Sequence, residues 1–291
     1  MDAHVHLHGC FEVDAFLDAA ARNFQAAAAE LGLPPSTPGC LLLAELQGEQ
    51  AFARLRGEVG RERSGPWRFE ATGEEASLIA RRPDRADRAE TSPPLVLVAG
   101  RQVRTREGLE VLALATLENF ADGLPFAGTL ERVHWSGALP VVPWGFGKWW
   151  FERGGLVEGL LQGREREAVF LGDNAGRPGL APRPPLFRLA ESHGVPVLPG
   201  SDPLPLAGHA GRAGSYGFVL DAGVDGQPAM PAMPAMPAAV LAETLRQGRQ
   251  AGWRPRAFGR CRGLLDFCRD QSALRLRERL ARLSALPKVA G

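Results

Sequence analysis

The 291-residue sequence lacks an excess of either charge. Lysine and arginine together number 34, aspartate and glutamate number 33, and the formal net charge is therefore +1. A balance so close to zero gives no electrostatic reason to bind nucleic acid or an anionic membrane surface. We therefore expect neither of these as a partner, and we expect a small-molecule substrate.

Cysteine is scarce, and the spacing of Cys10, Cys40, Cys261 and Cys268 matches no zinc-binding motif. We interpret them as reduced, partly buried thiols. No apolar run approaches the ~20 residues that a membrane helix needs. The N-terminus also lacks the basic segment and apolar stretch of a signal peptide. These absences favour a cytoplasmic protein.

Short strand patterns alternate with helical patterns along most of the chain. Strands are expected at 2–8, 39–48, 138–144, 168–174 and 195–202, helices at 15–31, 126–136, 149–161 and 185–193, and hairpins within 67–82 and 95–119. This alternation predicts parallel βαβ crossovers. No GxGxxG follows the first strand, so a dinucleotide-binding fold has little support. The number of units favours a barrel, with an open doubly wound sheet as the alternative.

The expected domain covers residues 1–260 and is followed by a helical extension at 261–291. Within the domain, 83–94 is charged and bounded by prolines, which indicates a solvated loop. The segment 227–239 repeats Ala-Met-Pro, and proline at every third position predicts a loop insertion. Segment 263–286 has the pattern of a basic amphipathic helix. It is expected to pack on the domain, and a partner-binding helix is the alternative.

Polar residues follow five of the expected strands. In a barrel the carboxyl ends of the strands carry the chemistry. Gathered there are His4, His6 and His8, then Glu45, Lys148, Asp173 with Asn174, and Asp202. Packing alone does not account for polar residues at the same end of five separate runs.

The three N-terminal histidines are spaced by two, which places them on one side of a regular strand. Two imidazoles and a carboxylate from a distant strand can hold one zinc, manganese or iron ion. Asp202, which follows the apolar stretch VPVLPG, is the expected carboxylate. The structural alternatives are a surface histidine cluster and a turn opened by Asp-Pro.

Two further carboxylates, Glu45 and Asp173, are candidates for the general base, and Glu45 is also a candidate metal ligand. The structural alternative for Glu45 is a salt bridge to an arginine. For Asp173 the alternatives are a helix cap and the anchor of the GDNAGRP loop. Lys148 is a catalytic candidate. Four residues are candidates for contacts with an anionic substrate: Lys148, Asn174, His209 and Arg212.

The opening MDAHVHLH resembles the first motif of the PHP (polymerase and histidinol phosphatase) metal-dependent hydrolases, within the amidohydrolase-like group. LLLAEL, GRQVRTREGLEVLALAT, ERVHWSGALPVVPWGFG and LPGSDPL are similar to later family motifs, in the right order. The resemblance covers residues 1 to about 205. It implies a distorted (β/α)7 TIM-like barrel with a hairpin insertion, divalent metals and hydrolysis, often of phosphoesters.

The chain departs from the family pattern at several ligand positions. Glu45-Leu46 stands where the family has Asp-His, Gln102 where it has glutamate, and Leu204 where it has the final histidine. The residues that match are His4, His6 and Asp202, with Glu45 as a conservative exchange. We therefore expect one divalent metal ion instead of a three-metal cluster.

Three functional hypotheses follow from these residues. The first is a mononuclear metal-dependent hydrolase acting on a phosphoester or a related C–O or C–N bond. The second is a catalytically degenerate PHP-like protein that binds a ligand or partner. The third is an amidohydrolase-type enzyme in which Lys148 forms a bridging carbamate.

Overall fold

The structure is a computed structural model that describes residues 1–83, 93–180, 182–220 and 237–284. Its first sheet has the order β1-β2-β5-β4-β3. The strands in that order are β1 (Asp2–Val5), β2 (Gly39–Leu43), β5 (Leu95–Val98), β4 (Ser77–Arg81) and β3 (Arg68–Ala71). The first three run parallel, whereas β4 and β3 form the antiparallel hairpin expected within 67–82.

A second five-stranded sheet has the order β10-β9-β8-β7-β6. Its strands are β10 (Val197–Gly200), β9 (Phe170–Asn174), β8 (Leu139–Pro143), β7 (Glu110–Leu114) and β6 (Gly100–Arg104). The first three are parallel and β7 is antiparallel to both of its neighbours. A separate antiparallel pair consists of β11 (Tyr216–Val219) and β12 (Arg256–Gly259).

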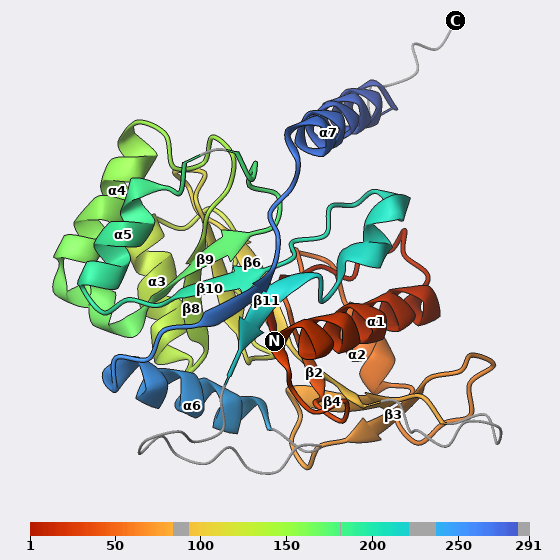
Figure 1. Cartoon of the computed structure of the whole chain (residues 1–291). Coiled ribbons are helices and arrows are strands. Elements are labelled where there is room, and N and C mark those ends of the chain that lie inside the picture. The colour runs from red at the N-terminus through yellow and green to blue at the C-terminus, as the bar shows by residue number, and fades with distance from the viewer. Residues whose placement is uncertain (84–92, 181, 221–236, 285–291) are drawn as a thin grey trace, which may run out of the picture.

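Helices cover the outer faces of both sheets, as Figure 1 shows. Beside the first sheet lie α1 (Val13–Leu31) and α2 (Ala51–Arg56), and beside the second lie α3 (Phe126–Trp135), α4 (Glu152–Gln162) and α5 (Pro185–Ser192). The remaining helices are α6 (Ala238–Gln250), α7 (Leu264–Ser284) and the 3₁₀ turns η1 (Arg164–Ala168) and η2 (Ala207–Arg212). The far end of α7 projects away from the body of the molecule.

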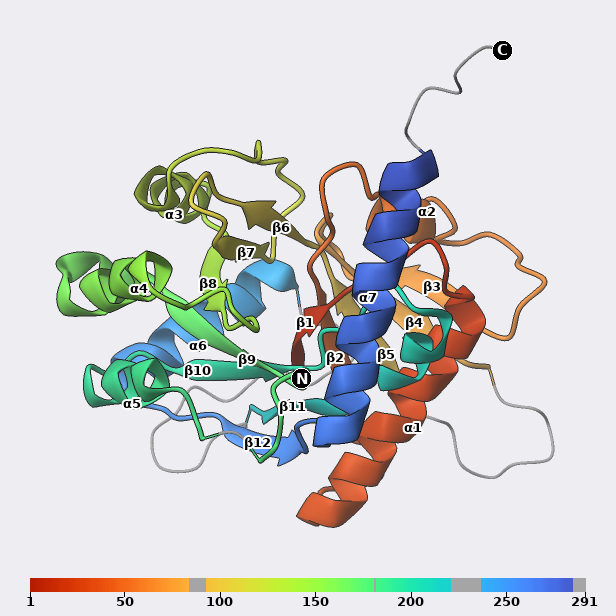
Figure 2. The ribbon, with the colours of Figure 1, turned by 90° about the horizontal axis from the view of Figure 1, so that it is seen from above.

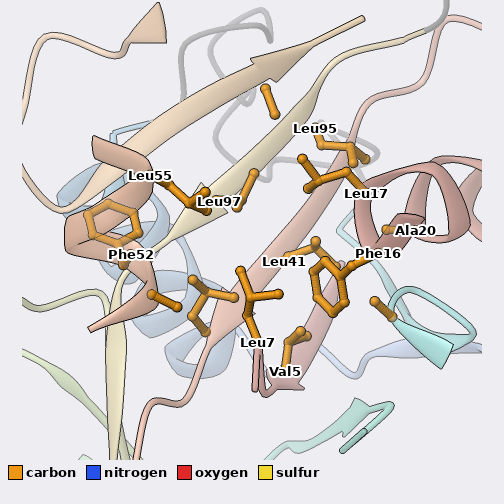
Figure 3. Close-up of a cluster of buried hydrophobic side chains, with 14 of the residues drawn as sticks. Val5, Leu7, Phe16, Leu17, Ala20, Leu41, Phe52, Leu55, Leu95 and Leu97 are labelled. Atoms are coloured by element: carbon orange, nitrogen blue, oxygen red, sulfur yellow. The ribbon is translucent and has the colours of Figure 1, made fainter. Parts of the chain in front are cut away.

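The apolar face of α1 packs on the first sheet because its apolar residues recur at helical spacing. Phe16, Leu17 and Ala20 are fully buried against Leu41 and Leu95 (Figure 3). The helix ends at Gly32, which takes the left-handed conformation (φ +68°) and donates its N–H to Ala28 and Ala29.

The predicted closed barrel is wrong. The described strands form sheets of five, five and two, and none of these sheets closes into a barrel. One reason is that the free edge of β5 is taken by the hairpin strand β4, so the first sheet ends in an antiparallel pair. The chain then passes Ala99 and begins β6, which pairs with β7 in the other sheet.

The two sheets nevertheless touch at two seams. At the first seam the Asp202 N–H donates to the His4 carbonyl (2.8 Å), and a Cβ on Gly200 would lie 2.5 Å from the His4 nitrogen. At the second, the Glu45 N–H donates to Gly100 (3.1 Å) and the Gln102 N–H donates to Glu45 (2.9 Å). Both seams depend on close backbone approach, which glycine allows.

Asp2 reinforces the first seam. Its carboxylate is fully buried and accepts N–H groups from Ser201 (2.8 Å), Gly214 (2.8 Å) and His4 (3.3 Å). Burial raises the pKa of this carboxyl to about 6, although the three N–H groups favour its ionised form. Asp2 thus ties the first strand to the segment that follows β10.

Most other expected elements are present, usually trimmed at their ends. The chief additions are η2, β11, α6 and β12, which follow the expected strand at 195–202. The solvated loop predicted at 83–94 and the Ala-Met-Pro insertion lie largely outside the described residues, which resume at 237 just before α6. The helix predicted at 263–286 is confirmed as α7. No described helix combines the length and apolar character that crossing a membrane requires.

Candidate metal centre

Residues far apart in the sequence meet at the first seam. The side chains of His4, His6 and Asp202 each offer a ligand atom, and these atoms lie within 4.8 Å of one another. His4 is on β1, His6 follows it, and Asp202 comes two residues after β10. Val5 and Leu7 point into the apolar core (Figure 3), so the alternation of the strand turns the imidazoles to its other face.

The spacing of the three ligand atoms suits a small divalent cation. The His4 and His6 Nε2 atoms are 3.0 Å apart, and they lie 3.6 Å and 3.4 Å from Asp202 Oδ1. In tetrahedral zinc coordination with metal–ligand bonds near 2.0–2.1 Å, neighbouring ligand atoms lie about 3.3 Å apart. The three edges of this triangle scatter around that value, so the residues fit such an ion.

The ionisation states suit a metal as well, because coordination needs a neutral imidazole and an ionised carboxylate. Burial, followed by the neighbouring His4 ring, lowers the pKa of His6 to about 3. Burial opposes ionisation of Asp202, yet the nearby basic side chains of His4, His6 and Lys148 hold the pKa of this carboxyl below its usual value. His6 is therefore neutral and Asp202 negative at neutral pH.

Asn174 fixes the orientation of the Asp202 carboxylate. Its Nδ2 donates to Asp202 Oδ2 (2.9 Å) and to the Trp144 carbonyl (2.8 Å), which leaves Oδ1 facing the two imidazoles. Asp202 has a positive φ of 44°, a backbone conformation that a non-glycine residue adopts at an energetic cost. Asn174, predicted to touch substrate, instead orients a candidate ligand.

His8 supports His6 by stacking. The two rings lie 5.1 Å apart with an interplanar angle of 11°. His8 is itself held by Glu49 Oε1 at Nδ1 (3.0 Å) and by the Pro203 carbonyl at Nε2 (3.1 Å). The Nδ1 atom of His6 is buried with no hydrogen-bond partner among the described residues, so stacking positions this ring.

The predicted role of Glu45 as ligand or base is not supported by its contacts. Its Oε1 accepts the Phe52 N–H (2.6 Å) at the start of α2, and its Oε2 accepts the Arg101 guanidinium (2.7 Å). Burial raises the pKa of this carboxyl, while Phe52 and Arg101 act in the opposite direction. The structure therefore places Glu45 in the salt bridge that was its structural alternative.

Asp173 is similarly engaged. Arg177 donates to both of its carboxylate oxygens (2.9 Å each), and the Tyr216 hydroxyl donates to Oδ2 (2.9 Å). These bonds pin the loop after β9 to β11. Asp173 thus anchors the GDNAGRP loop and is not free to act as the predicted base.

The remaining predicted substrate contacts also have partners within the protein. Lys148 is ion-paired with Glu110, and this engagement of its amino group argues against the bridging carbamate. His209 is buried and contacts Asp270 (3.1 Å), and the Arg212 guanidinium donates to the same carboxylate (3.2 Å). His209 lies within the turn η2.

One residue near the cluster was treated in the sequence only as a lost ligand. The Oε1 atom of Gln102, on β6, lies 3.0 Å from His4 Nε2. The signal available in the sequence was its place in the GRQVRT segment, where the resembled family carries a glutamate.

Comparison with known proteins leaves the chain without an assigned family. No family model matches it, and no curated protein matches it. Among solved structures it is similar to the crystal structure of PsfC from Pseudomonas syringae PB-5123, with 16% identity and a TM-score of 0.45. That alignment covers 86% of this chain and 97% of PsfC. The PHP resemblance stays a prediction.

Proposed function

We propose that this chain is a metal-dependent hydrolase that uses one divalent ion, zinc, manganese or iron, held by His4, His6 and Asp202. The observation that carries the proposal is the convergence of these three side chains within 4.8 Å from positions nearly two hundred residues apart. When bound, such an ion supplies Lewis acidity towards an oxygen of the substrate or of water. A phosphoester or a related C–O or C–N bond of a small anionic molecule is the proposed target.

The protein's own groups prepare the site for this chemistry. Asn174 aims Asp202 at the two imidazoles, and the His8 ring holds that of His6. Lys148 is one of the basic side chains that lower the pKa of the Asp202 carboxyl. We assign Lys148 the role of attracting the anionic group of the substrate. In this role its amino group would leave Glu110, with which it is paired in the structure.

The second candidate function is a metal- or ligand-binding protein without catalysis. The observation that favours it is that both predicted bases are locked in ion pairs, Glu45 with Arg101 and Asp173 with Arg177. The exposed thiols of Cys10 and Cys268 suit a reducing compartment, and on that ground we propose a cytoplasmic location.

Metal analysis with a turnover screen separates the two functions. We expect the wild type to carry about one zinc or manganese per chain and to hydrolyse phosphoesters, amides or lactones in a metal-dependent way. The His4→Ala/His6→Ala double variant should lose the metal, and Asp202→Asn should lose turnover. His134→Ala is the matched control, because His134 is exposed on α3.

Equal, negligible metal in the wild type and the double variant would refute the metal site. Stoichiometric metal without turnover across the whole screen would favour the non-catalytic function. Turnover that survives Asp202→Asn would place the chemistry elsewhere in the molecule.

A further inference from the structure

The Nε2 atom of His4 has more polar neighbours than one imidazole nitrogen can satisfy. His6 Nε2 lies 3.0 Å from it, Gln102 Oε1 3.0 Å and Asp202 Oδ1 3.6 Å. This nitrogen carries at most one proton, so it donates to one neighbour or accepts from one. Three polar atoms around one such nitrogen are better explained by a shared cation than by a hydrogen-bond network.

The amide of Gln102 is held at this point by the second seam. Its backbone N–H donates to the Glu45 carbonyl (2.9 Å), and the residue pairs with Leu112 on β7. The preceding residue, Arg101, reaches the Glu45 carboxylate and the Glu49 carbonyl (2.7 and 2.8 Å). Neighbours on a strand point to opposite faces. Arg101 therefore binds the segment that follows β2, whereas Gln102 faces the cluster.

From these contacts we infer that Gln102 is a fourth metal ligand, through the neutral oxygen Oε1. The inference rests on the proposed function, because it concerns the same ion. Carbonyl oxygens are suitable ligands for divalent cations beside imidazole and carboxylate. The resulting set is two imidazoles, one carboxylate and one amide, supplied by both sheets and both seams.

The neutral charge of this ligand has two consequences. The set carries a single formal negative charge, that of Asp202, so a bound divalent ion keeps an excess positive charge that attracts an anionic substrate. A neutral ligand also adds no carboxylate that could bridge to a second ion. The neighbouring carboxylates cannot supply one, because Glu45 is paired with Arg101 and Glu49 with His8. A glutamate at position 102 would remove the first property and weaken the second.

The competing explanation is that Gln102 only hydrogen-bonds His4 and so positions its ring. The two roles differ in what they do to a bound ion. A ligand changes the coordination sphere, and therefore the visible absorption of Co²⁺ placed in the site. A residue that acts through His4 leaves the number and kind of coordinating atoms unchanged.

The experiment titrates purified wild type, Gln102→Ala, Gln102→Glu and the control Gln162→Ala with Co²⁺, followed by its visible absorption. The Kd for Zn²⁺ is measured in parallel by competition with a chromophoric chelator. Gln162 is an exposed glutamine near the end of α4. We expect Gln102→Ala to weaken Zn²⁺ binding by at least about tenfold and to alter the Co²⁺ spectrum. Gln102→Glu should tighten binding, because it adds a negative charge.

A Co²⁺ spectrum left unchanged by Gln102→Ala, whatever the Zn²⁺ affinity of this variant, would overturn the inference while leaving the three-residue site intact. A wild type that binds neither ion would refute the proposed function itself, so the two failures are distinguishable. Thermal unfolding of the metal-free variants controls for loss of fold. Should Gln102→Ala unfold, Gln102→Leu, which fills the space of the side chain without supplying an oxygen, decides between the two roles by its spectrum.

Discussion

At the scale of single residues, Asn174 shows how a neutral side chain controls a charged one. Its amide bridges the Trp144 carbonyl and Asp202 Oδ2, and thereby connects the loop after β8 to the segment after β10. Without this bond Asp202 could rotate its carboxylate away from the imidazoles. The strained backbone of Asp202, with φ at +44°, would then have less to hold it in place.

We therefore predict that Asn174→Ala weakens Zn²⁺ binding by about 10- to 100-fold, the range typical when the partner of a metal ligand is removed. Chelator competition on the wild type and the variant measures the effect. Asn23→Ala is the matched control, because Asn23 also donates two hydrogen bonds to carbonyls, those of Gly211 and Ala213. Equal affinities for the wild type and Asn174→Ala would show that Asp202 needs no such support.

The sequence predicted some residues of the site well and others poorly, for a physical reason. Strand alternation placed His4 and His6 on one side, and the structure brings Asp202 to them. The partners of Glu45 and Asp173 were not predictable, because many arginines were available and only the folded chain selects Arg101 and Arg177. Gln102 was treated only as a lost ligand. Its place in the GRQVRT segment was visible in the sequence, but its contact with His4 depends on a seam between two sheets.

At the scale of elements, α7 is attached to the site by a buried cluster of charges. Asp270, on the inner face of α7, is contacted by Arg262 (2.5 Å), Arg212 (3.2 Å) and His209 (3.1 Å). Leu204 donates its N–H to His209 Nδ1 (3.0 Å), only two residues after Asp202. Through His209 this cluster connects α7 to the segment that carries Asp202. Figure 2, which looks down from above, shows α7 along its length.

His209 gives this attachment a pH dependence. Burial lowers the pKa of His209 and the charge of Arg262 lowers it further, whereas Asp270 and, more weakly, Asp202 raise it, and the net direction is downward. Protonation of His209 at Nδ1 would also break the hydrogen bond that Nδ1 accepts from the Leu204 N–H, because the two N–H groups would then face each other. The unfolded chain therefore binds this proton more readily than the folded protein, and the stabilisation is complete above about pH 6.5.

We predict that His209 contributes a fall in the free energy of unfolding as the pH drops from about 6.5 towards the lower pKa of the folded state. Urea unfolding of metal-free protein between pH 5 and 8 measures it. His6 contributes in the same direction, so the test is the difference between wild type and His209→Gln. That variant should show a flatter profile, and parallel profiles would contradict the prediction.

Elements with a strong pattern of their own were predictable, and those defined by tertiary contacts were not. The helix at 13–31 has a complete apolar face and a glycine stop, and it was expected within two residues of its observed start. The barrel was expected because the strands alternate with helices. The apolar edge of β5 could pair with β4 or with another strand of a barrel, and the sequence does not distinguish the two. In the structure it pairs with β4, which belongs to the hairpin at 68–81.

At the scale of the whole molecule, the candidate ligands span the boundary between the two sheets. His4 and His6 belong to the first sheet and its extension, whereas Asp202 and Gln102 belong to the second. Among the described residues, the first seam is otherwise held by a backbone hydrogen bond, by the contacts of Asp2 and by the pairing of His8 with Pro203. An ion at this point would therefore cross-link the sheets and stabilise the fold.

We predict that Zn²⁺ at about one hundred times its Kd raises the free energy of unfolding by about 2.7 kcal/mol, because it binds the folded chain and not the unfolded one. For a protein of 291 residues, that corresponds to a rise in Tm of roughly 4–5 °C. Calorimetry with added Zn²⁺ and with a chelator measures the shift. His134→Ala should keep the whole rise, whereas His4→Ala/His6→Ala should lose it.

The same calorimetric measurement tests whether the ion is bound by residues of both sheets or by residues of the first sheet alone. If it bridges them, Asp202→Asn should remove most of the Zn²⁺-dependent rise, although this variant keeps both imidazoles. A rise that survives Asp202→Asn would mean that the first sheet alone holds the ion. The seam would then owe its stability to Asp2, whose fully buried carboxylate binds backbone N–H groups on both sides of it.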